Sequence, residues 1–399
     1  MSRLVLKFTA ALAVGLSALL YQMRLPRMVS LGFGLGKTRD SLSAYPYTCR
    51  RLHHERLMAC EDMWLSEATR QLFLACSEPL SSQGHFNVSG RYLDDAVVVI
   101  NVDDLSNGPN VDARVLSMPG FTGTNGDGLL GLVGFGATDD ADGGIRLWVI
   151  NDRPSLDLHT GEILDQAKVG ANTTVELFRA GPGAKSMEHV RTFYHPHIAS
   201  PNRIAPVGGN TDAFYFTNDH GTAKVGLRHM LSPLLGTGDV SFCDGVECRQ
   251  VVPGQNFPNG LTKGHDGLLY VPSSLLGTID VYQPQPGGDL TKLHTIETGY
   301  SLDNLRPDRD GHIFAAAITN AIKFFAAMSD PYHKTTPTAG LRVTKNAAGG
   351  YEVTKVVEDG LGEVLPGATT VLHDAATGRI FLSGVGSPYI AVCDRKQDP

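Results

Sequence analysis

Side chains with oxygen donors recur along the chain, each beside a short apolar stretch. The group comprises Glu61, Asp62, Asn202, Asn218, Asp219, Asn259, Asp303 and Asn304. Carboxylate and amide oxygens are the ligands that Ca²⁺ prefers, usually about six to eight around one ion. A single Asn or Asp beside Gly is more often a turn residue, so the prediction depends on the recurrence. Softer metals would need clusters of Cys and His, which the sequence lacks.

Other local motifs give weaker signals. No Gly-x-Ser-x-Gly elbow is present, which counts against a serine hydrolase. Three aspartates at 139, 140 and 142 precede Gly143 and Gly144. A solvated turn is favoured there over a calcium loop, because the glutamate and the spacing of an EF-hand are missing.

Short apolar segments bounded by Gly, Asp, Asn or Pro indicate many β-strands joined by turns. Gly and Pro are abundant, with 45 and 22 residues. We expect strands at residues 71–75, 96–102, 145–150, 174–178, 213–216, 268–271, 278–282, 312–316, 322–325 and 379–382, and a short helix at 227–235.

A common lead-in ending in Gly precedes three of these strands, at residues 265–267, 308–311 and 374–378. Comparable strands begin near 71, 145 and 213, which gives six units. A degenerate repeat with several strands per unit is typical of a β-propeller, in which closure of the ring removes exposed sheet edges. The sequence therefore predicts an all-β fold, a six-bladed β-propeller over residues 45–399. A pair of β-sandwiches is the alternative, and it leaves the repeat unexplained.

The N-terminus has features of the secretory route. Arg3 and Lys7 precede a mostly apolar run, so residues 1–23 are predicted to form a hydrophobic helix, either a signal peptide or an uncleaved signal anchor. Residues 24–44 are interpreted as a linker or an N-terminal arm. Asn87 and Asn172 stand in Asn-x-Ser/Thr sequons and are candidate glycosylation sites. We expect a protein of the secretory pathway, either membrane-anchored or secreted.

Six cysteines in this context predict up to three disulfides. Cys243 and Cys248 flank an Asp-Gly turn and fit a local hairpin bridge. A bridge between Cys49 and Cys393 would tie the two ends of the folded region. The cysteines at positions 60 and 76 are left as a third pair or as free thiols.

Several short motifs together resemble the animal paraoxonase/arylesterase family, from about Cys49 to Cys393. They are residues 60–62, 174–178, 214–220, 257–260, 302–305 and 364–369. The resemblance implies a six-bladed propeller with two calcium ions in its tunnel, a ring-closing disulfide at the terminal cysteines, and hydrolysis of lactones and aryl esters. It also implies an axial Ca²⁺ that polarises the substrate carbonyl, held by Glu61, Asn202, Asn259, Asp303 and Asn304.

The chain departs from the family beside one predicted ligand. The family's second calcium uses an aspartate directly after the ligand asparagine, and this chain has Arg203 there. A guanidinium group cannot ligate a cation. We therefore expect one axial ion only, with Arg203 paired to Asp62 in place of the second.

The family's histidine pair is also missing, because Leu130 and Asp152 stand at its two positions. His220 and Asp303 are left as candidate bases. The net charge of −7 offers no basic face for nucleic acid and suits a small neutral substrate. The sequence thus predicts a calcium-dependent hydrolase of small lactones or activated esters. The alternative is a calcium-binding propeller that binds a ligand without catalysis or performs other chemistry.

Overall fold

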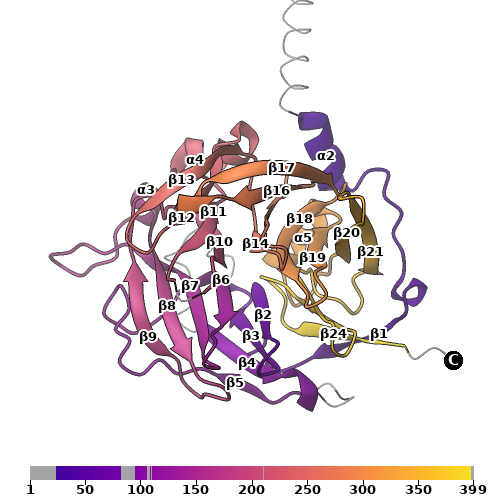
Figure 1. Ribbon diagram of the computed structural model, residues 1–399, viewed down its shortest axis with the longest axis horizontal. Helices are drawn as coiled ribbons and strands as arrows, with labels where there is room; N and C mark the ends of the chain where they lie inside the picture. The colour runs from indigo at the N-terminus through magenta and orange to yellow at the C-terminus, as the bar shows by residue number, and fades with distance from the viewer. Residues whose placement is uncertain (1–23, 82–94, 106–107, 109, 210, 397–399) are drawn as a thin grey trace, which may run out of the picture.

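The computed structural model describes residues 24–81, 95–105, 108, 110–209 and 211–396 of the chain. Six four-stranded antiparallel sheets surround a central axis (Figure 1), which confirms the predicted six-bladed β-propeller. The predicted hydrophobic helix at 1–23 and the sequon at Asn87 lie outside the described residues. In the part of the chain that the structure describes, no helix combines the length and the apolar character needed to cross a membrane.

Each blade consists of strands that follow one another along the chain. Blades one to three contain β2 (Asp62–Ser66), β3 (Gln71–Cys76), β4 (Ala96–Asn101) and β5 (Ala113–Val115); β6 (Leu132–Asp139), β7 (Ile145–Pro154), β8 (Ala171–Ala180) and β9 (Glu188–Phe193); and β10 (Pro201–Pro206), β11 (Phe214–Asn218), β12 (Gly238–Cys243) and β13 (Cys248–Gln255). Blades four and five contain β14 (Thr262–Lys263), β15 (Leu269–Ser273), β16 (Thr278–Pro284) and β17 (Leu290–Glu297), and β18 (Ser301–Pro307), β19 (Ile313–Ile318), β20 (Thr338–Lys345) and β21 (Tyr351–Asp359).

Blade six closes the ring with strands from both ends of the chain. It contains β22 (Thr370–Asp374), β23 (Arg379–Ser383), β24 (Ile390–Arg395) and, as its outermost strand, β1 (Tyr47–Leu52). Cys49 and Cys393 stand opposite each other in the β1–β24 pair and form a disulfide. Hydrogen bonds and a covalent link therefore join the two ends of the propeller at the same place.

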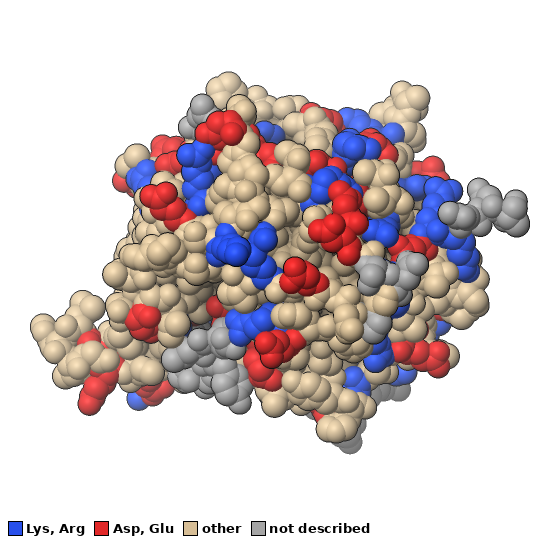
Figure 2. Space-filling model, turned by 90° about the horizontal axis from the view of Figure 1, so that it is seen from below, with Lys and Arg blue, Asp and Glu red and all other residues tan. Residues whose placement is uncertain are grey.

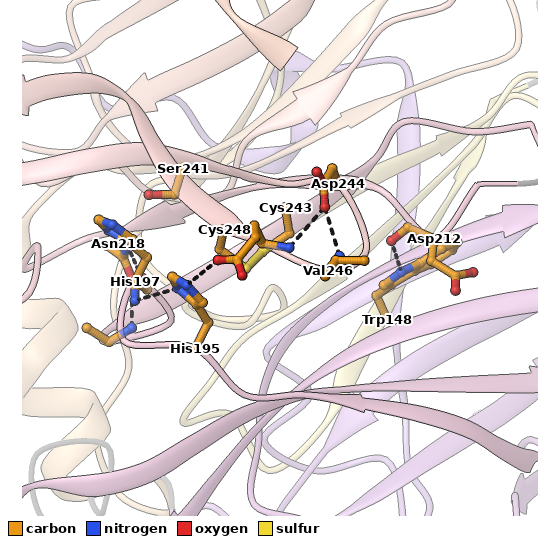
Figure 3. Close-up of a disulfide and its surroundings, with 12 residues drawn as sticks. Trp148, His195, His197, Asp212, Asn218, Ser241, Cys243, Asp244, Val246 and Cys248 are labelled. Atoms are coloured by element: carbon orange, nitrogen blue, oxygen red, sulfur yellow. Dashed lines mark hydrogen bonds and ion pairs between the residues drawn. A yellow bond between two sulfur atoms is a disulfide. The ribbon is translucent and has the colours of Figure 1, made fainter. Parts of the chain in front are cut away.

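The other cysteines form two local disulfides. Cys60 and Cys76 are bonded to each other, which settles the pair that the sequence left open. Cys243 and Cys248 close the β12–β13 hairpin, where Asp244 accepts a hydrogen bond from the backbone N–H of Val246 over 2.8 Å (Figure 3). No free cysteine occurs among the described residues.

The hydrophobic core is divided into six clusters, one at each interface between neighbouring blades. Successive residues of a strand point to opposite faces of its sheet, so one strand serves two interfaces. In β3, Leu72 and Leu74 pack toward blade six, whereas Phe73 and Ala75 pack toward blade two. This two-sided burial explains why the strands read as nearly continuous apolar runs in the sequence.

The repeated lead-ins occupy one place in their blades, the turn between the first and second strands. Gly267, Gly311 and Gly378 have φ angles of +77°, +87° and +71° in blades four, five and six. Residues with a Cβ atom rarely adopt this left-handed conformation, so the turn favours glycine. The repeat that predicted the propeller is therefore a requirement of turn geometry.

Helices cover one end of the ring. The predicted short helix is present as α4 (Gly226–Leu235), and a single turn, α3 (Gln166–Val169), precedes β8. The expected strand at 322–325 was wrong, because these residues lie in α5 (Ala321–Ser329). The side chain of Asn320 caps this helix by accepting a hydrogen bond from the N–H of Lys323, and three alanines favour it.

Residues 24–44 pack along the outside of the propeller. They contain α2 (Leu25–Phe33), which lies beside α5 in Figure 1, and a 3₁₀ turn, Leu42–Ala44. Asn320 donates a hydrogen bond to the carbonyl of Phe33 over 3.1 Å, and Lys355 forms an ion pair with Asp40 over 2.6 Å. These contacts attach the segment to blade five.

Candidate functional site

Several predicted ligands lie at irregular positions in the sheets or just outside regular strands. The pairing of β10 shifts register around Asn202, and that of β18 shifts around Asp303 and Asn304. A β-bulge of this kind re-aims the side chains that it frees from the ladder. Glu61 directly precedes β2, and Asn259 lies just before β14, so neither belongs to a regular strand.

The structure brings these five residues together, and they are called the oxygen cluster below. Glu61, Asn202, Asn259 and Asp303 line one cavity. Asn304 lies behind them and donates from Nδ2 to Glu61 Oε1 over 3.1 Å. Asn259, Asp303 and Asn304 are only 5%, 6% and 2% exposed. The predicted ligand set therefore converges at one place near the axis.

Three oxygens of the oxygen cluster are buried without a hydrogen-bond partner among the described residues: Glu61 Oε2, Asn202 Oδ1 and Asp303 Oδ1. Buried polar atoms are nearly always paired in folded proteins. Burial, and then the charge of Asp303, raises the pKa of Glu61. Burial, and then the charge of Asp62, raises the pKa of Asp303 to about 8. A cation among these oxygens would pair them and offset the cost of two buried carboxylates.

The donor set suits a hard cation. The described residues hold no group of three or more His, Cys, Asp or Glu side chains arranged to bind a metal. The oxygen cluster offers two carboxylates, and its other donors are amide oxygens. Ca²⁺ accepts amide oxygens readily, whereas Zn²⁺ and Cu²⁺ favour imidazole and thiolate. The residues present thus fit one ion of the calcium type.

The cavity above the oxygen cluster has a volume of about 710 Å³. Apolar side chains from α4 and α5 form much of its wall, including Met230, Phe324, Phe325 and Met328. A cavity of this size with a small polar base is typical of a site for a small organic ligand.

His220, one of the two predicted bases, lines the same cavity. It follows β11, and its Nδ1 lies 2.7 Å from Asp219 Oδ1. An ionised carboxylate only accepts hydrogen bonds, so Nδ1 carries the hydrogen and Nε2 is left for other partners. Asp303, the other predicted base, belongs to the oxygen cluster itself.

A second charged region, here called the arginine hub, lies next to the oxygen cluster. It consists of Asp62, Arg203 and Arg306, which are 0%, 0% and 5% exposed. Arg203 Nε lies 3.1 Å and Arg306 Nη2 lies 2.7 Å from the same oxygen, Asp62 Oδ2. Burial, and then the nearby Arg306, lowers the pKa of Arg203 to about 9, so Arg203 remains charged at neutral pH.

The arginine hub is connected to all six blades. Asp62 accepts hydrogen bonds from the backbone N–H of Met63 in blade one (2.9 Å) and of Phe135 in blade two (3.3 Å). It also accepts a hydrogen bond from the Thr370 hydroxyl group of blade six (3.2 Å). Arg203 of blade three donates from Nη1 to carbonyls of blades five and four, Leu305 O (2.5 Å) and Gly260 O (3.4 Å). A second cation beside Asp62 would face two guanidinium groups, so these residues do not fit one.

The two positions of the missing histidine pair have different surroundings. Leu130 is 1% exposed and packs in the hydrophobic cluster between blades one and two. Asp152, in β7, lines the cavity. Neither residue supplies an imidazole, so a histidine base in this cavity has to come from another element.

Sequence reasoning missed three residues of the site. Arg306 lies in β18, three residues after the predicted ligand Asp303 and inside a strand that is almost fully buried, and a charged side chain there was a usable signal. Lys224 and His229 line the cavity from the segment before α4 and from α4 itself. Lys224 donates to the carbonyl of Ala171 over 2.9 Å, and burial lowers its pKa. Nothing in the sequence indicated that this helix would turn toward the axis.

The remaining predicted positions do not line the cavity. Asn172, a candidate glycosylation site, is half-buried in β8. The aspartates near 140 form a turn, in which Asp142 accepts from the N–H of Gly144 over 3.0 Å and Asp140 pairs with Arg146 over 2.8 Å.

Comparison with known proteins gives matches of sequence and of fold. Over 212 residues the chain is 29% identical to serum paraoxonase/arylesterase 1 of Homo sapiens, covering 50% of this chain and 55% of that protein. Over 163 residues it is 31% identical to serum paraoxonase/arylesterase 2 of Rattus norvegicus, covering 40% of this chain and 45% of that protein. The chain thus spans about half the length of these curated relatives.

One solved structure, a luciferin-regenerating enzyme, is 10% identical with a TM-score of 0.51, over 87% of this chain and 95% of that one. This likeness concerns the fold alone. The family model described as Arylesterase matches residues 166–385, more than half of the chain. That segment includes Asn202, Asn259, Asp303 and Asn304 of the oxygen cluster, and the match confirms the resemblance drawn from the short motifs. The chain is therefore a member of the arylesterase family.

Proposed function

We propose that the chain hydrolyses small lactones or aryl esters in the axial cavity. The observation that carries this proposal is the set of three buried oxygens without a hydrogen-bond partner among the described residues, in a cluster at the base of a cavity that His220 also lines. In this proposal one Ca²⁺ is held by Glu61, Asn202, Asn259, Asp303 and Asn304. A Ca²⁺ ion held by these residues would supply a Lewis acid for the substrate carbonyl and for the oxyanion that develops from it.

The chain's own residues prepare the site for this chemistry. Asn304 orients the Glu61 carboxylate through its 3.1 Å hydrogen bond. His220 is the proposed general base, because Asp219 holds its Nδ1–H and leaves Nε2 able to take a proton from water. The apolar wall from α4 and α5 limits the access of other water. Asp303, whose pKa is raised to about 8 by burial and then by the charge of Asp62, is the alternative base.

The cavity indicates the class of substrate. Its wall is mainly apolar, which suits an uncharged ring or acyl group. On the face shown in Figure 2, acidic and basic side chains are interspersed and no broad basic patch is present. This surface agrees with the net charge of −7 and favours a small-molecule ester or lactone over nucleic acid.

We also propose that the protein follows the secretory route. Three disulfides support an oxidising compartment. Residues 1–23 then act as a signal peptide or as an uncleaved anchor. Deletion of these residues should release an anchored protein from membranes, measured by fractionation. A deletion variant that stays membrane-bound would place the attachment elsewhere.

The direct test is hydrolysis of phenyl acetate and of a δ-lactone, with Ca²⁺ or with EDTA. We expect turnover that EDTA abolishes, and a loss of about 10²–10⁴-fold in His220→Ala. The alternative, a binding propeller without catalysis, follows from the replacement of the histidine pair by Leu130 and Asp152. Calcium binding without turnover of either substrate would favour that alternative.

A further inference from the structure

Two imidazole rings are stacked at the wall of the axial cavity. His220 follows β11, and His229 lies in α4. Their ring centroids are 3.9 Å apart, and their planes are inclined by only 12°. Phe257 contacts the His220 ring from another side, edge-on at 5.3 Å and 83°. The His220 ring therefore has one ring stacked on it and a second ring nearly perpendicular to it.

Hydrogen bonds determine where each ring carries its hydrogen. Asp219 Oδ1 lies 2.7 Å from His220 Nδ1, and the carbonyl oxygen of Ala223 lies 2.7 Å from His229 Nδ1. Both partners only accept, so each Nδ1 is a donor. The Nε2 of each neutral ring then has a free lone pair. Neither Nε2 hydrogen-bonds to a residue that the structure describes.

The two rings have different electrostatic surroundings. Burial lowers the pKa of His229, and the neighbouring His220 lowers it further, against the opposing effect of the hydrogen bond to Ala223. His229 is therefore neutral at neutral pH. The Asp219 carboxylate, 2.7 Å from His220 Nδ1, faces the imidazolium that forms when His220 takes a proton during the reaction. A neutral ring face is a favourable neighbour for that cation.

We propose that His229 is a positioning residue for the general base His220, and that α4 thereby supports the histidine function that Leu130 and Asp152 cannot supply. The inference rests on the proposed hydrolase function. It assigns His229 no proton transfer, because stacked rings present their faces and not their nitrogens to each other. Its contribution is to fix the plane of the His220 ring so that Nε2 stays directed for reaction.

The proton balance of the step is simple. The oxygen of a water molecule bonds to the carbonyl carbon while one of its protons passes to His220 Nε2. Asp219 continues to accept Nδ1–H, which stabilises the imidazolium. As the C–O bond of the ester or lactone breaks, the proton passes from Nε2 to the leaving oxygen. His220 is then neutral again, and His229 has exchanged nothing.

The chain offers a matched control pair. His195 and His197 are also stacked, with centroids 5.4 Å apart and planes inclined by 10°. They lie beside the Cys243–Cys248 disulfide (Figure 3), where His195 Nε2 is 3.3 Å from Glu247 Oε2. Neither lines the axial cavity. Loss of this second stack should therefore leave catalysis unchanged.

The experiment compares His229→Phe, His229→Ala and His197→Ala on phenyl acetate and a δ-lactone with Ca²⁺ present. Phenylalanine keeps a neutral ring face, and alanine removes it. We expect His229→Ala to lower kcat about tenfold with little change in KM, because orientation and not binding is lost. His229→Phe should stay within about threefold of the wild type, and His197→Ala should match it.

Two kinetic results would overturn the proposal: full kcat in His229→Ala, or an equal loss in the Phe and Ala variants. If the wild type turns over neither substrate, the hydrolase function itself fails. The positioning role is then decided by NMR of the His220 ring. The ring-current shift from His229 should disappear in His229→Ala and persist in His229→Phe. Signals that are the same in all variants would refute the stack.

Discussion

Residues that are adjacent in the sequence serve two different regions at the axis. Glu61 and Asn202 belong to the oxygen cluster, whereas Asp62 and Arg203, the next residues along the chain, belong to the arginine hub. The oxygen cluster contains two carboxylates and no cation of its own. The arginine hub contains two cations that share one carboxylate. A positive charge in the oxygen cluster would thus have to come from a bound ion, whereas the arginine hub has its positive charges on Arg203 and Arg306.

The two regions also support each other electrostatically. The charge of Arg203 lowers the pKa of Asp303, opposing the larger effects of burial and Asp62, which raise it. With all three carboxyl groups ionised, as a bound cation would favour, the five side chains carry three negative and two positive charges, which leaves one negative charge for that cation to offset. The contrast predicts that an exchangeable ion binds only where buried oxygens lack a partner among the described residues, and that closure of the axis does not depend on a metal.

Loss of one carboxylate from the oxygen cluster should have the largest effect. We expect Asp303→Ala to abolish Ca²⁺ binding by isothermal titration, because it removes one of only two charged donors. Asn259→Ala should act in the same direction. The exposed Asp310→Ala, in the same blade, is the control and should bind one ion like the wild type. Full Ca²⁺ binding by Asp303→Ala would show that the oxygen cluster is not the metal site. Two ions per wild-type chain would contradict the inference that the arginine hub does not fit a second ion.

Removal of a charge from the arginine hub should act on folding. Arg203→Met leaves Asp62 with one guanidinium and deletes the hydrogen bonds to two other blades. Breaking a buried ion pair on one side costs about 3–5 kcal/mol, which denaturant unfolding would detect. The exposed Arg309→Met is the control. A stability equal to that of the wild type would mean that the arginine hub contributes little to the free energy of unfolding. The proposed difference between the arginine hub and the oxygen cluster would then be wrong.

The sequence predicted the fold well because turns and strand patterns are local. Gly267 and Gly311 mark turns that need a left-handed residue, and they mark them whatever surrounds the blade. The five proposed ligands came from the family resemblance, and the fold brings four of them, Glu61, Asn202, Asn259 and Asp303, to one cavity. His229 was not predictable, because its role depends on how α4 folds back over the axis. The strand predicted at residues 322–325 was wrong. Ile and Phe are common in strands, but the Asn320 cap and the alanines of this segment favour a helix.

Closure at the rim provides a further comparison with closure at the axis. Cys49→Ser with Cys393→Ser removes the covalent link but leaves the β1–β24 hydrogen bonds. A disulfide that closes a long loop contributes about 2–4 kcal/mol, so we expect a lower melting temperature. The Cys243–Cys248 disulfide closes only a short hairpin, so its replacement by two serines should lower the free energy of unfolding by less. An unchanged melting curve for the first variant would show that strand pairing and the arginine hub already suffice.

Chelation should have the smallest effect on stability. A ligand present at about 100 times its Kd stabilises the native state by about 2.7 kcal/mol, and EDTA removes no more than this. The metal-free propeller should therefore stay folded, with a modestly lower Tm in calorimetry and full recovery when Ca²⁺ is restored. In Arg203→Met the Tm is already expected to be lower than in the wild type. EDTA should lower it further and bring unfolding closer to the assay temperature. If EDTA unfolds the wild type outright, the ion and not the arginine hub holds the axis closed.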